Sequence, residues 1–337
     1  MIEFRSEMRD GLTRDTAVAS DSRDRPKPGR GEVLIKLHAA AVNPAAFLSE
    51  DGKNAFVVKT KFPHGSGLCV SGIVVARGAN VTGRDLGDAV YGYLPNAALS
   101  TCAVFQPAHA AHVREMPLNA DFREAAALPL VGSAVIQAFE KNGPRAGDRI
   151  LIHEGGGAVG SFAIQYAKFL GATVFTTTST ENADWVRELG ADGILDYQLV
   201  DYRDELRGLD MVLDTLGGDA TFSAFDVIRP GGAVVSLFGP VDDRAAKRLK
   251  LNPLMRQVLW FKGRDLRRKA KEKSARYSFV PMVPDCTHLA TIRELVESGT
   301  VRPVVDTTSF DPANAMEALA YHGRGRAQGT IVLDFSG

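Results

Sequence analysis

The sequence predicts a two-domain α/β protein in which a β-rich domain accompanies a doubly wound parallel sheet. Its 337 residues exceed the usual size of one hydrophobic core, so two domains are expected. Up to about residue 125 the chain shows short apolar or alternating runs separated by Gly and Pro, which are typical of strands and turns. After that point strand patterns alternate with helix patterns, which indicates βα units and a parallel sheet.

The composition argues against several classes of protein. Lys plus Arg balance Asp plus Glu at 40 each and 45% of the residues are hydrophobic, which is typical of a globular protein and gives no sign of nucleic-acid binding. Cys69, Cys102 and Cys286 are odd in number and far apart, which favours free thiols in a reducing compartment and offers no paired spacing for zinc. The chain has no apolar run of about 18 residues, and acidic residues occur early, unlike in a signal peptide. We therefore expect a cytoplasmic protein.

Three runs predict the strands of the first domain. They cover residues 31–42, 69–78 and 87–94. A helix is predicted at 121–143, where Gly143 and Pro144 end it. The pattern changes at this helix, so we place the domain boundary near residue 125.

Strands and helices alternate in the second domain. The predicted strands cover 149–153, 173–178, 193–197 and 209–215, and the predicted helices between them cover 161–171 and 182–190. Residues 221–239 supply a helix, a Pro-Gly-Gly turn and another strand. A helix at 289–299 and a strand at 329–335 close the chain. Repeated βα units of this length imply right-handed crossovers and a doubly wound sheet.

A glycine-rich turn, HEGGGAVG, lies between the first strand and the first helix of this sheet. Gly155, Gly157 and Gly160 form G-x-G-x-x-G, and the flanking strand and helix make the motif a strong indication of dinucleotide binding. The first glycine permits the tight turn, the second lets the backbone approach a pyrophosphate, and the third lets the helix pack on the strand. The phosphates would lie at the positive end of the helix. The candidate cofactor-binding residues of the turn are Gly155, Gly156, Gly157, Ala158, Val159 and Gly160. The alternative is a flexible loop with a chance spacing.

The end of the second strand bears on which nucleotide is bound. Sites for NAD usually place an acid there, which accepts hydrogen bonds from the ribose 2′-hydroxyl. Here residues 176–180 are all Thr or Ser, and the first acid is Glu181. Hydroxyl groups do not repel a 2′-phosphate, so NADP(H) is favoured, while Glu181 keeps NAD(H) open. The candidate contacts are Thr178, Ser179 and Asn182, and the nearest bases in sequence are Lys168 and Arg187.

Several segments resemble the medium-chain dehydrogenase/reductase superfamily in order and spacing. They are GEVLIKLHAAAVNP, AAALPLVGSA, GDRILIHEGGGAVGSFAIQYAKFLGATVFTTTS, LGADGILDY, VRPVVD and GRAQGTIVLDF. Within the superfamily the chain is most similar to the zinc-independent quinone oxidoreductase branch, with its reticulon-4-interacting-protein-like members. The resemblance runs from Gly31 to Phe335.

The resemblance implies how the chain is divided. Residues 1–125 and 286–337 would form a GroES-like catalytic domain, and residues 126–285 a Rossmann domain that binds NADP(H). The cofactor would lie in the cleft between the two domains. Members of the branch are commonly dimers, so a homodimer is expected.

The resemblance also implies roles for Asn43 and Tyr197, and Ser133 and Gly239 are further candidates. All except Gly239 have a structural alternative. Asn43 is the candidate catalytic residue, a hydrogen-bond donor near the nicotinamide and the substrate carbonyl, although an Asn before Pro also starts turns. Ser133 would line the cofactor cleft, or is a buried helix serine. Tyr197 would pack near the adenosine phosphate, or only at the sheet edge. Gly239 would let the backbone approach the nicotinamide ribose.

Zinc-dependent relatives carry their metal ligands at positions that here hold Asn43, Leu68 and Cys69. Catalytic zinc needs about three N, S or O side chains, so no metal is expected. Hydride transfer then requires a substrate that is already electrophilic, such as a quinone or an α,β-unsaturated carbonyl. The run at 43–46, Asn-Pro-Ala-Ala, lacks the acid that family members often carry after the proline. This keeps open the alternative of an NADP(H)-binding redox-sensing or structural protein with little turnover.

No side chain stands out as proton donor. The candidates are Tyr91, Tyr93, His64 and His153, and water is the alternative, because a quinol or enolate can take its proton from solvent. Glu154 in the glycine turn would repel a pyrophosphate if it pointed inwards, so we expect it to point away.

One segment is strongly basic. Residues 242–276 carry 13 Lys or Arg against 4 Asp or Glu, around the apolar run NPLMRQVLWFKG. We favour a solvated insertion that covers the active-site mouth and the dimer edge. The alternatives are attraction of an anionic substrate such as acyl-CoA, and contact of Trp260 and Phe261 with an anionic membrane surface.

Overall fold

Two compact units make up the fold. The computed structural model describes residues 2–9, 12–19, 27–42, 69–93, 102–105, 113–281, 285–323, 325 and 327–336. Unit 1 comprises Met1–Ser133 and Pro284–Gly337, and unit 2 comprises Ala134–Val283. The first unit is therefore assembled from both ends of the chain. The division falls inside a long helix, whereas the change of sequence pattern placed it at the start of that helix.

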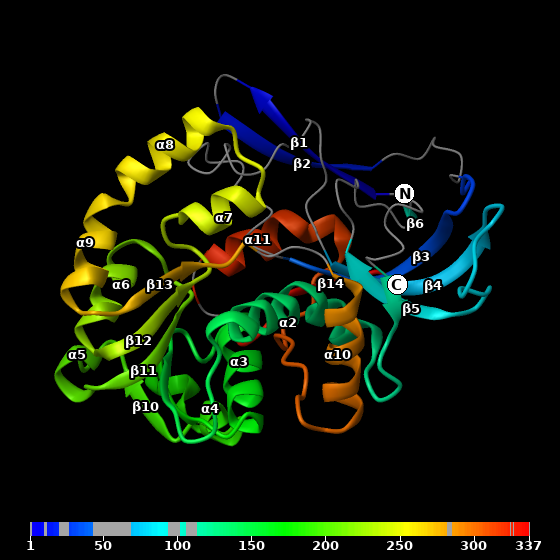
Figure 1. The fold of residues 1–337 in the computed structure, drawn as a ribbon. Coiled ribbons are helices and arrows are strands. Elements are labelled where there is room, and N and C mark those ends of the chain that lie inside the picture. Colours follow the sequence, from blue (N-terminus) through cyan, green and yellow to red (C-terminus); the bar gives the residue numbers. More distant parts are fainter. Residues whose placement is uncertain are drawn as a thin grey trace. The chain divides into compact units, whose positions relative to one another are not determined.

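Unit 2 contains a six-stranded parallel sheet (Figure 1). Its strands are β8 (Arg149–Ile152), β9 (Thr173–Thr178), β10 (Gly193–Asp196), β11 (Leu209–Asp214), β12 (Ile228–Ser236) and β13 (Arg276–Phe279). The order is β10-β9-β8-β11-β12-β13, so the chain winds outwards from β8 in one direction and then from β11 in the other. This is the doubly wound arrangement that the sequence predicts. Ligands of such sheets bind where the order reverses, here between the carboxyl ends of β8 and β11.

The helices of unit 2 connect these strands. They are α3 (Ala158–Phe169), η2 (Thr180–Asn182), α4 (Ala183–Glu188), α5 (Tyr202–Glu205), α6 (Gly218–Ser223), η3 (Ala224–Asp226), α7 (Asp243–Arg248), α8 (Pro253–Lys262) and α9 (Arg264–Glu272). The middle residues of the central strands are apolar because a parallel sheet is covered on both faces. Leu151, Val212 and Val234 accordingly lie in one core cluster and are fully buried.

The Pro-Gly-Gly run lies inside a strand, where the register of the ladder shifts, and does not form a separate turn. Strand β12 continues through Pro230 and Gly231, and its register against β11 shifts between Leu209 and Met211. Pro lacks an N–H to donate to the ladder, and Gly231 has a φ of 81°. The residues that punctuate turns therefore interrupt the ladder here without ending the strand.

Unit 1 is built on an antiparallel sheet in the order β14-β3-β4-β5-β7, with β6 also paired to β3. The strands are β3 (Val33–Ala41), β4 (Cys69–Arg77), β5 (Ala89–Tyr93), β6 (Cys102–Phe105), β7 (Val113–Glu115) and β14 (Val332–Asp334). A separate hairpin pairs β1 (Ile2–Arg9) with β2 (Leu12–Ala19). The helices are α2 (Phe122–Asn142), of which only the part up to Ser133 belongs to unit 1, α10 (Cys286–Glu297), η4 (Pro312–Asn314) and α11 (Ala315–Gly323).

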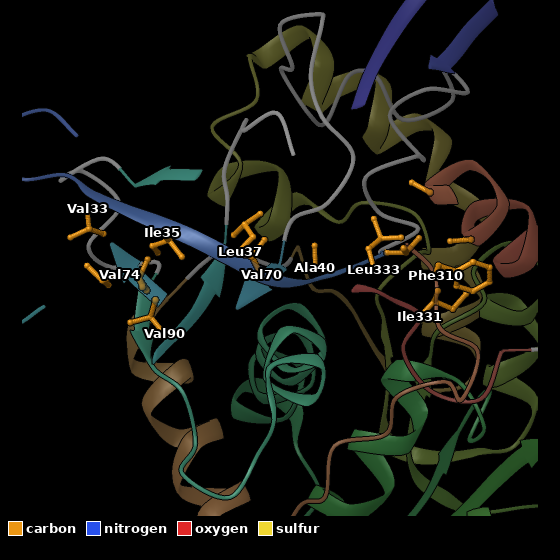
Figure 2. Packing of buried hydrophobic residues seen from close by; sticks show 14 residues of the cluster. Val33, Ile35, Leu37, Ala40, Val70, Val74, Val90, Phe310, Ile331 and Leu333 are labelled. Atoms are coloured by element: carbon orange, nitrogen blue, oxygen red, sulfur yellow. The ribbon is translucent and has the colours of Figure 1, made fainter. Parts of the chain in front are cut away.

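The core of unit 1 joins the two ends of the chain. Alternate residues of β3, beginning with Val33 and Ile35, point to one face of the sheet, as the period of a strand requires. Figure 2 shows them together with Val90 of β5 and with Ile331 and Leu333 from the C-terminal segment. Burial of these side chains fixes the last strand beside β3, where Val332 pairs with Ala41. None of the described helices has the length and apolar character to cross a membrane.

Candidate functional site

The glycine turn joins the end of β8 to the start of α3, at the point where the strand order reverses. Gly157 is the N-cap of α3 in extended backbone, and no side chain caps the helix. The first N–H groups of a helix have no acceptor within it, and the helix dipole adds positive charge at this end. The turn therefore offers backbone donors to an anion, as the G-x-G-x-x-G motif predicts.

The glycines of the turn differ in how closely they are packed. A Cβ on Gly160 would lie 2.0 Å from the carbonyl oxygen of Glu154, and one on Gly155 would lie 2.3 Å from Thr176 Oγ1. By contrast, the nearest atom to a Cβ on Gly157 is 3.3 Å away. Gly155 is thus required because the turn packs closely against β9. Gly160 is required because α3 packs closely against the turn. Gly157 leaves room outside the backbone for a ligand.

The threonines of β9 hold the turn in place. The Gly155 N–H donates to Thr177 O at 2.9 Å, and the Glu154 N–H donates to Thr177 Oγ1 at 3.2 Å. Thr176 Oγ1 donates to Ile152 O at 2.7 Å. The first two hydroxyls of the threonine run therefore serve the fold. A Cβ on Gly156 would lie 3.0 Å from both Thr178 Oγ1 and Asn182 Nδ2, so these two predicted contacts do lie beside the turn.

An acid that the sequence analysis did not single out lies next to the end of β9. Asp196, the last residue of β10, accepts hydrogen bonds from Thr180 N at 2.7 Å, from Thr180 Oγ1 and from Gln198 N at 2.8 Å. The hydroxyl of Thr180 lowers the pKa of Asp196, so the group is ionised. Glu181 is exposed to solvent. Tyr197 is 61% exposed, and its N–H donates to Thr178 O at 3.3 Å.

The two bases that are nearest to the end of β9 in sequence form ion pairs. Lys168 Nζ lies 2.8 Å from a carboxylate oxygen of Asp192, and Arg187 lies 3.1 Å from Asp184 Oδ1. The second pair is exposed on the surface of α4. Such a pair contributes little to the stability of the fold, so it can rearrange. Of the two, Arg187 is therefore the base that can turn towards a phosphate.

Asp214, the last residue of β11, is fully buried and joins the loops that follow two strands. Its Oδ1 accepts hydrogen bonds from the N–H groups of Leu216 and Gly217, both at 3.0 Å. Its Oδ2 accepts from Thr221 Oγ1 at 2.5 Å and from Ser236 Oγ at 2.6 Å. The carboxylate thus fixes the backbone at the carboxyl edge of the sheet, next to the glycine turn.

The same carboxylate also engages a candidate proton donor. His153 Nδ1 lies 3.4 Å from Asp214 Oδ1, and both side chains are fully buried. Burial alone would raise the pKa of Asp214, but hydrogen bonds from His153, Ser236 and Thr221 outweigh it and hold the pKa well below its usual range. His153 is therefore a partner of Asp214 inside unit 2, which argues against direct proton donation to a substrate.

Glu154 has a left-handed backbone, with a φ of 53°. Its Oε2 accepts a hydrogen bond from Thr215 Oγ1 at 3.1 Å, so the side chain reaches from the end of β8 towards the end of β11. The prediction that it points away from the phosphates is therefore not supported. Burial raises the pKa of Glu154, while the hydrogen bond from Thr215 and the neighbouring His153 lower it.

Gly239 follows β12 and faces a polar group of side chains. Its N–H donates to Ser236 Oγ at 2.7 Å, and a Cβ at this position would lie 2.6 Å from Tyr277 Oη. The glycine is thus required by packing beneath the loop. An approach of its backbone to a cofactor stays a prediction.

The tyrosines proposed as proton donors are buried in unit 1. Tyr93 Oη donates to Pro129 O at 2.8 Å and contacts Ser133 Oγ, while Tyr91 Oη donates to Leu289 O at 2.6 Å. Burial raises the pKa of both tyrosines. Ser133 itself has no exposed surface, which fits the alternative of a buried helix serine. Its contact with a cofactor stays a prediction.

The remaining predicted site residues fall outside the described part of the chain. These are Asn43, His64 and Leu68. Cys69 begins β4 and is buried. Among the described residues, no group of three or more His, Cys, Asp or Glu side chains is arranged to hold a metal ion.

A cavity of about 390 Å³ lies elsewhere in unit 2. Its lining includes Asp148, Asp210, Arg229 and Arg276, which lie at or near the amino ends of β8, β11, β12 and β13. The glycine turn is at the opposite, carboxyl edge of the sheet. The cavity is therefore separate from the candidate cofactor site.

Two family models match the chain. The one described as alcohol dehydrogenase GroES-like domain matches residues 29–129, and the one described as zinc-binding dehydrogenase matches residues 189–333. The chain is 33% identical over 313 residues to 2-methylene-furan-3-one reductase of Solanum lycopersicum, and the matched region covers 90% of this chain and 71% of that protein. It is 30% identical over 325 residues to the mitochondrial NAD(P)H oxidoreductase RTN4IP1 of Danio rerio, with 90% and 83% covered.

A solved structure is similar over almost its full length. The quinone oxidoreductase from Coxiella burnetii matches with a TM-score of 0.79 at 26% identity, covering 99% of this chain and 98% of that chain. The similarity thus includes both the antiparallel sheet of unit 1 and the doubly wound sheet of unit 2. This chain belongs to the medium-chain dehydrogenase/reductase family, in its quinone oxidoreductase branch.

Proposed function

We propose that this protein catalyses the NADPH-dependent reduction of a quinone or an α,β-unsaturated carbonyl without a metal ion. The observation that carries the proposal is the uncapped N-terminus of α3 behind the glycine turn, at the reversal of strand order. The names of the relatives, a furanone reductase and an NAD(P)H oxidoreductase, support the same chemistry.

Residues of unit 2 fit a dinucleotide. The backbone of Gly157, Ala158 and Val159 would hold the pyrophosphate, because these residues are the N-cap and first turn of α3. Thr178, Ser179 and Asn182 would contact the adenosine ribose, and Arg187 would pair with its 2′-phosphate. NADPH supplies the hydride when bound. The chain supplies orientation and backbone donors, and Asn43 is our proposed donor to the substrate carbonyl.

The proton is proposed to come from solvent. Reduction of a quinone or enone adds a hydride, with its electron pair, and one proton. Tyr91, Tyr93 and His153 each have another partner in the interior. An enolate or quinolate can take its proton from water, so no buried acid is needed.

A cofactor and substrate panel tests the proposed reaction. NADPH or NADH oxidation is measured with 1,4-quinones, 2-alkenals and enoyl-CoA esters, after dialysis against a chelator. We expect turnover of at least one class, with higher kcat/KM for NADPH than for NADH. Rates equal to the blank across the panel, with NADPH still bound, would leave the alternative of a redox-sensing or structural NADP(H)-binding protein.

Oligomeric state and compartment are proposed from the family and the sequence. We expect a homodimer in the cytoplasm, where cysteines outside disulfides, such as Cys69 and Cys286, stay reduced. Light scattering on the purified chain measures the mass in solution, and a monomer would contradict the first expectation.

Glu154 makes NADPH binding depend on pH. Because its pKa is raised, more of this carboxyl stays protonated at a given pH than for an ordinary glutamate, and the ionised fraction grows as the pH rises. A second negative charge, from the pyrophosphate, disfavours that ionised form further. Binding should therefore weaken with rising pH and take up protons, and Glu154→Gln should bind about 3- to 10-fold more tightly than wild type where the wild-type carboxyl is ionised.

Calorimetry in two buffers with different ionisation enthalpies measures this proton uptake. The 2′-phosphate also takes up a proton, with a pKa of about 6, so the difference between wild type and Glu154→Gln is the informative quantity. Glu205→Gln, at an exposed glutamate of α5, is the matched control and should behave as wild type. Equal proton uptake by wild type and Glu154→Gln would show that this carboxyl does not sense the cofactor.

A further inference from the structure

Helix α8 carries an apolar stripe on its exposed side. Leu254, Val258 and Phe261 are spaced i, i+4 and i+7, which places them on one face of the helix. Their side chains are 72%, 43% and 59% exposed, and no residue of α8 is buried. A solvated insertion would present polar side chains outwards, so this stripe needs another explanation.

Helix α9 follows directly and is fixed to unit 2 (Figure 1). Leu266 and Ala270 are buried in the core cluster of unit 2, and Lys269 Nζ lies 3.1 Å from Asp226. The exposed residues of α9 are mainly basic. They are Arg264, Arg267, Arg268 and Lys271, together with Asp265 and Glu272. The core contacts thus hold a basic surface beside the apolar stripe.

Aromatic and basic side chains meet where the two helices join. The Arg267 guanidinium lies 4.5 Å from the centre of the Trp260 ring, and Trp260 meets Phe261 edge to face with centroids 5.2 Å apart. Exposed aromatic rings flanked by Lys and Arg are typical of helices that lie in a membrane interface. The Trp260 ring is half exposed and is thus available to lipid headgroups.

We propose that α8 and α9 form a docking surface for an anionic phospholipid membrane. The stripe of Leu254, Val258 and Phe261 would enter the interface while the basic side chains contact the lipid headgroups. Residues 242–276 carry 13 basic against 4 acidic residues, although the whole chain is balanced, so the attraction is local. A second copy docked through the same face would oppose two basic surfaces, which argues against self-association there.

The proposal does not depend on the proposed reaction. An anionic surface attracts each nearby Lys or Arg, and insertion of apolar side chains adds to this attraction. Docking would nevertheless bring the enzyme to quinones or enones with long apolar tails, which partition into lipid. Binding of the membrane is therefore measured without cofactor or substrate.

Vesicle co-sedimentation of the full chain tests the docking surface. We expect sedimentation with vesicles of phosphatidylcholine and phosphatidylserine at low salt, release at high salt, and little sedimentation with phosphatidylcholine alone. The emission of Trp260 should shift to shorter wavelength with the anionic vesicles, and Trp260→Phe should remove the shift. Absence of sedimentation, or equal sedimentation with both vesicles, would overturn the proposal.

Two double variants locate the surface. Leu254→Ser/Phe261→Ser and Lys262→Glu/Lys271→Glu should each lower partitioning onto anionic vesicles at least about tenfold. Leu118→Ser is the matched control, because Leu118 is 86% exposed in unit 1 and should not matter. All four changed positions are exposed, so thermal unfolding should match wild type. If the first variant changed the mass in solution but not vesicle binding, the stripe would be an interface between two copies.

Discussion

Replacing Asp214 by alanine is expected to lower the free energy of unfolding by about 3 to 5 kcal/mol. The carboxylate is fully buried and accepts two backbone N–H groups and two hydroxyl groups, those of Thr221 and Ser236. Without it these donors stay buried with no acceptor, and each costs about 1 to 3 kcal/mol where water cannot reach it. The loops after β11 and β12 lose their common anchor, so NADPH binding should weaken as well.

Urea unfolding followed by circular dichroism measures the loss. Ser236→Ala removes only one of the donors, which also include His153, and should cost about 1 kcal/mol. Asp219→Asn is the matched control, because Asp219 is an exposed acid on the neighbouring helix α6. A cost for Asp214→Ala no larger than that for Ser236→Ala would mean that the carboxylate does not organise these loops.

The pH dependence of stability gives a second measurement on the same group. The pKa of Asp214 is depressed in the folded protein, so its stabilising effect is present above the unfolded pKa of about 4 and is lost as the pH falls below that value. The wild type should therefore lose stability on acidification below about pH 4, and Asp214→Asn should lose less. An equal slope for both proteins would contradict the depressed pKa.

The sequence predicts the elements around the glycine turn almost residue for residue. Strand β9 begins and ends where the pattern places it, and β8, α3 and β11 differ from their predicted bounds by only a few residues. These elements are local and strongly periodic, and glycines mark their ends. The Pro230–Gly232 run was misjudged because an irregularity within a strand and a turn use the same residue types, and only the partner strand distinguishes them.

The polar contacts of the site could not be predicted in the same way. An acid at the end of a strand can equally begin a turn, so the local sequence does not reveal what Asp214 contacts. Its partners are distant in sequence: His153 directly follows β8, and Ser236 ends β12. Tyr93 illustrates the opposite error. Its residue type suggests a proton donor, but in the structure its hydroxyl donates to a backbone carbonyl of α2. A buried strand that ends in a carboxylate is nonetheless a usable signal, because such a group must find donors.

The two glycines of the turn should separate folding from cofactor binding. In an ordinary helix Gly→Ala stabilises by up to about 1 kcal/mol. At Gly160 the new Cβ would lie 2.0 Å from the carbonyl oxygen of Glu154, so Gly160→Ala must shift α3 away from the turn. We expect it to cost about 1 to 3 kcal/mol of stability and to weaken NADPH binding at the same time.

Gly157→Ala is the matched variant, because its φ of −82° suits alanine and its Cβ would meet no atom closer than 3.3 Å. It should leave the free energy of unfolding within about 0.5 kcal/mol of wild type. The pyrophosphate is expected to approach the backbone at this residue, so the added methyl group should weaken NADPH binding at least about tenfold. Urea unfolding and calorimetric titration on both variants measure the two effects. If Gly157→Ala folds and binds NADPH as wild type does, the pyrophosphate does not bind at this turn. The proposed cofactor would then lose its main support.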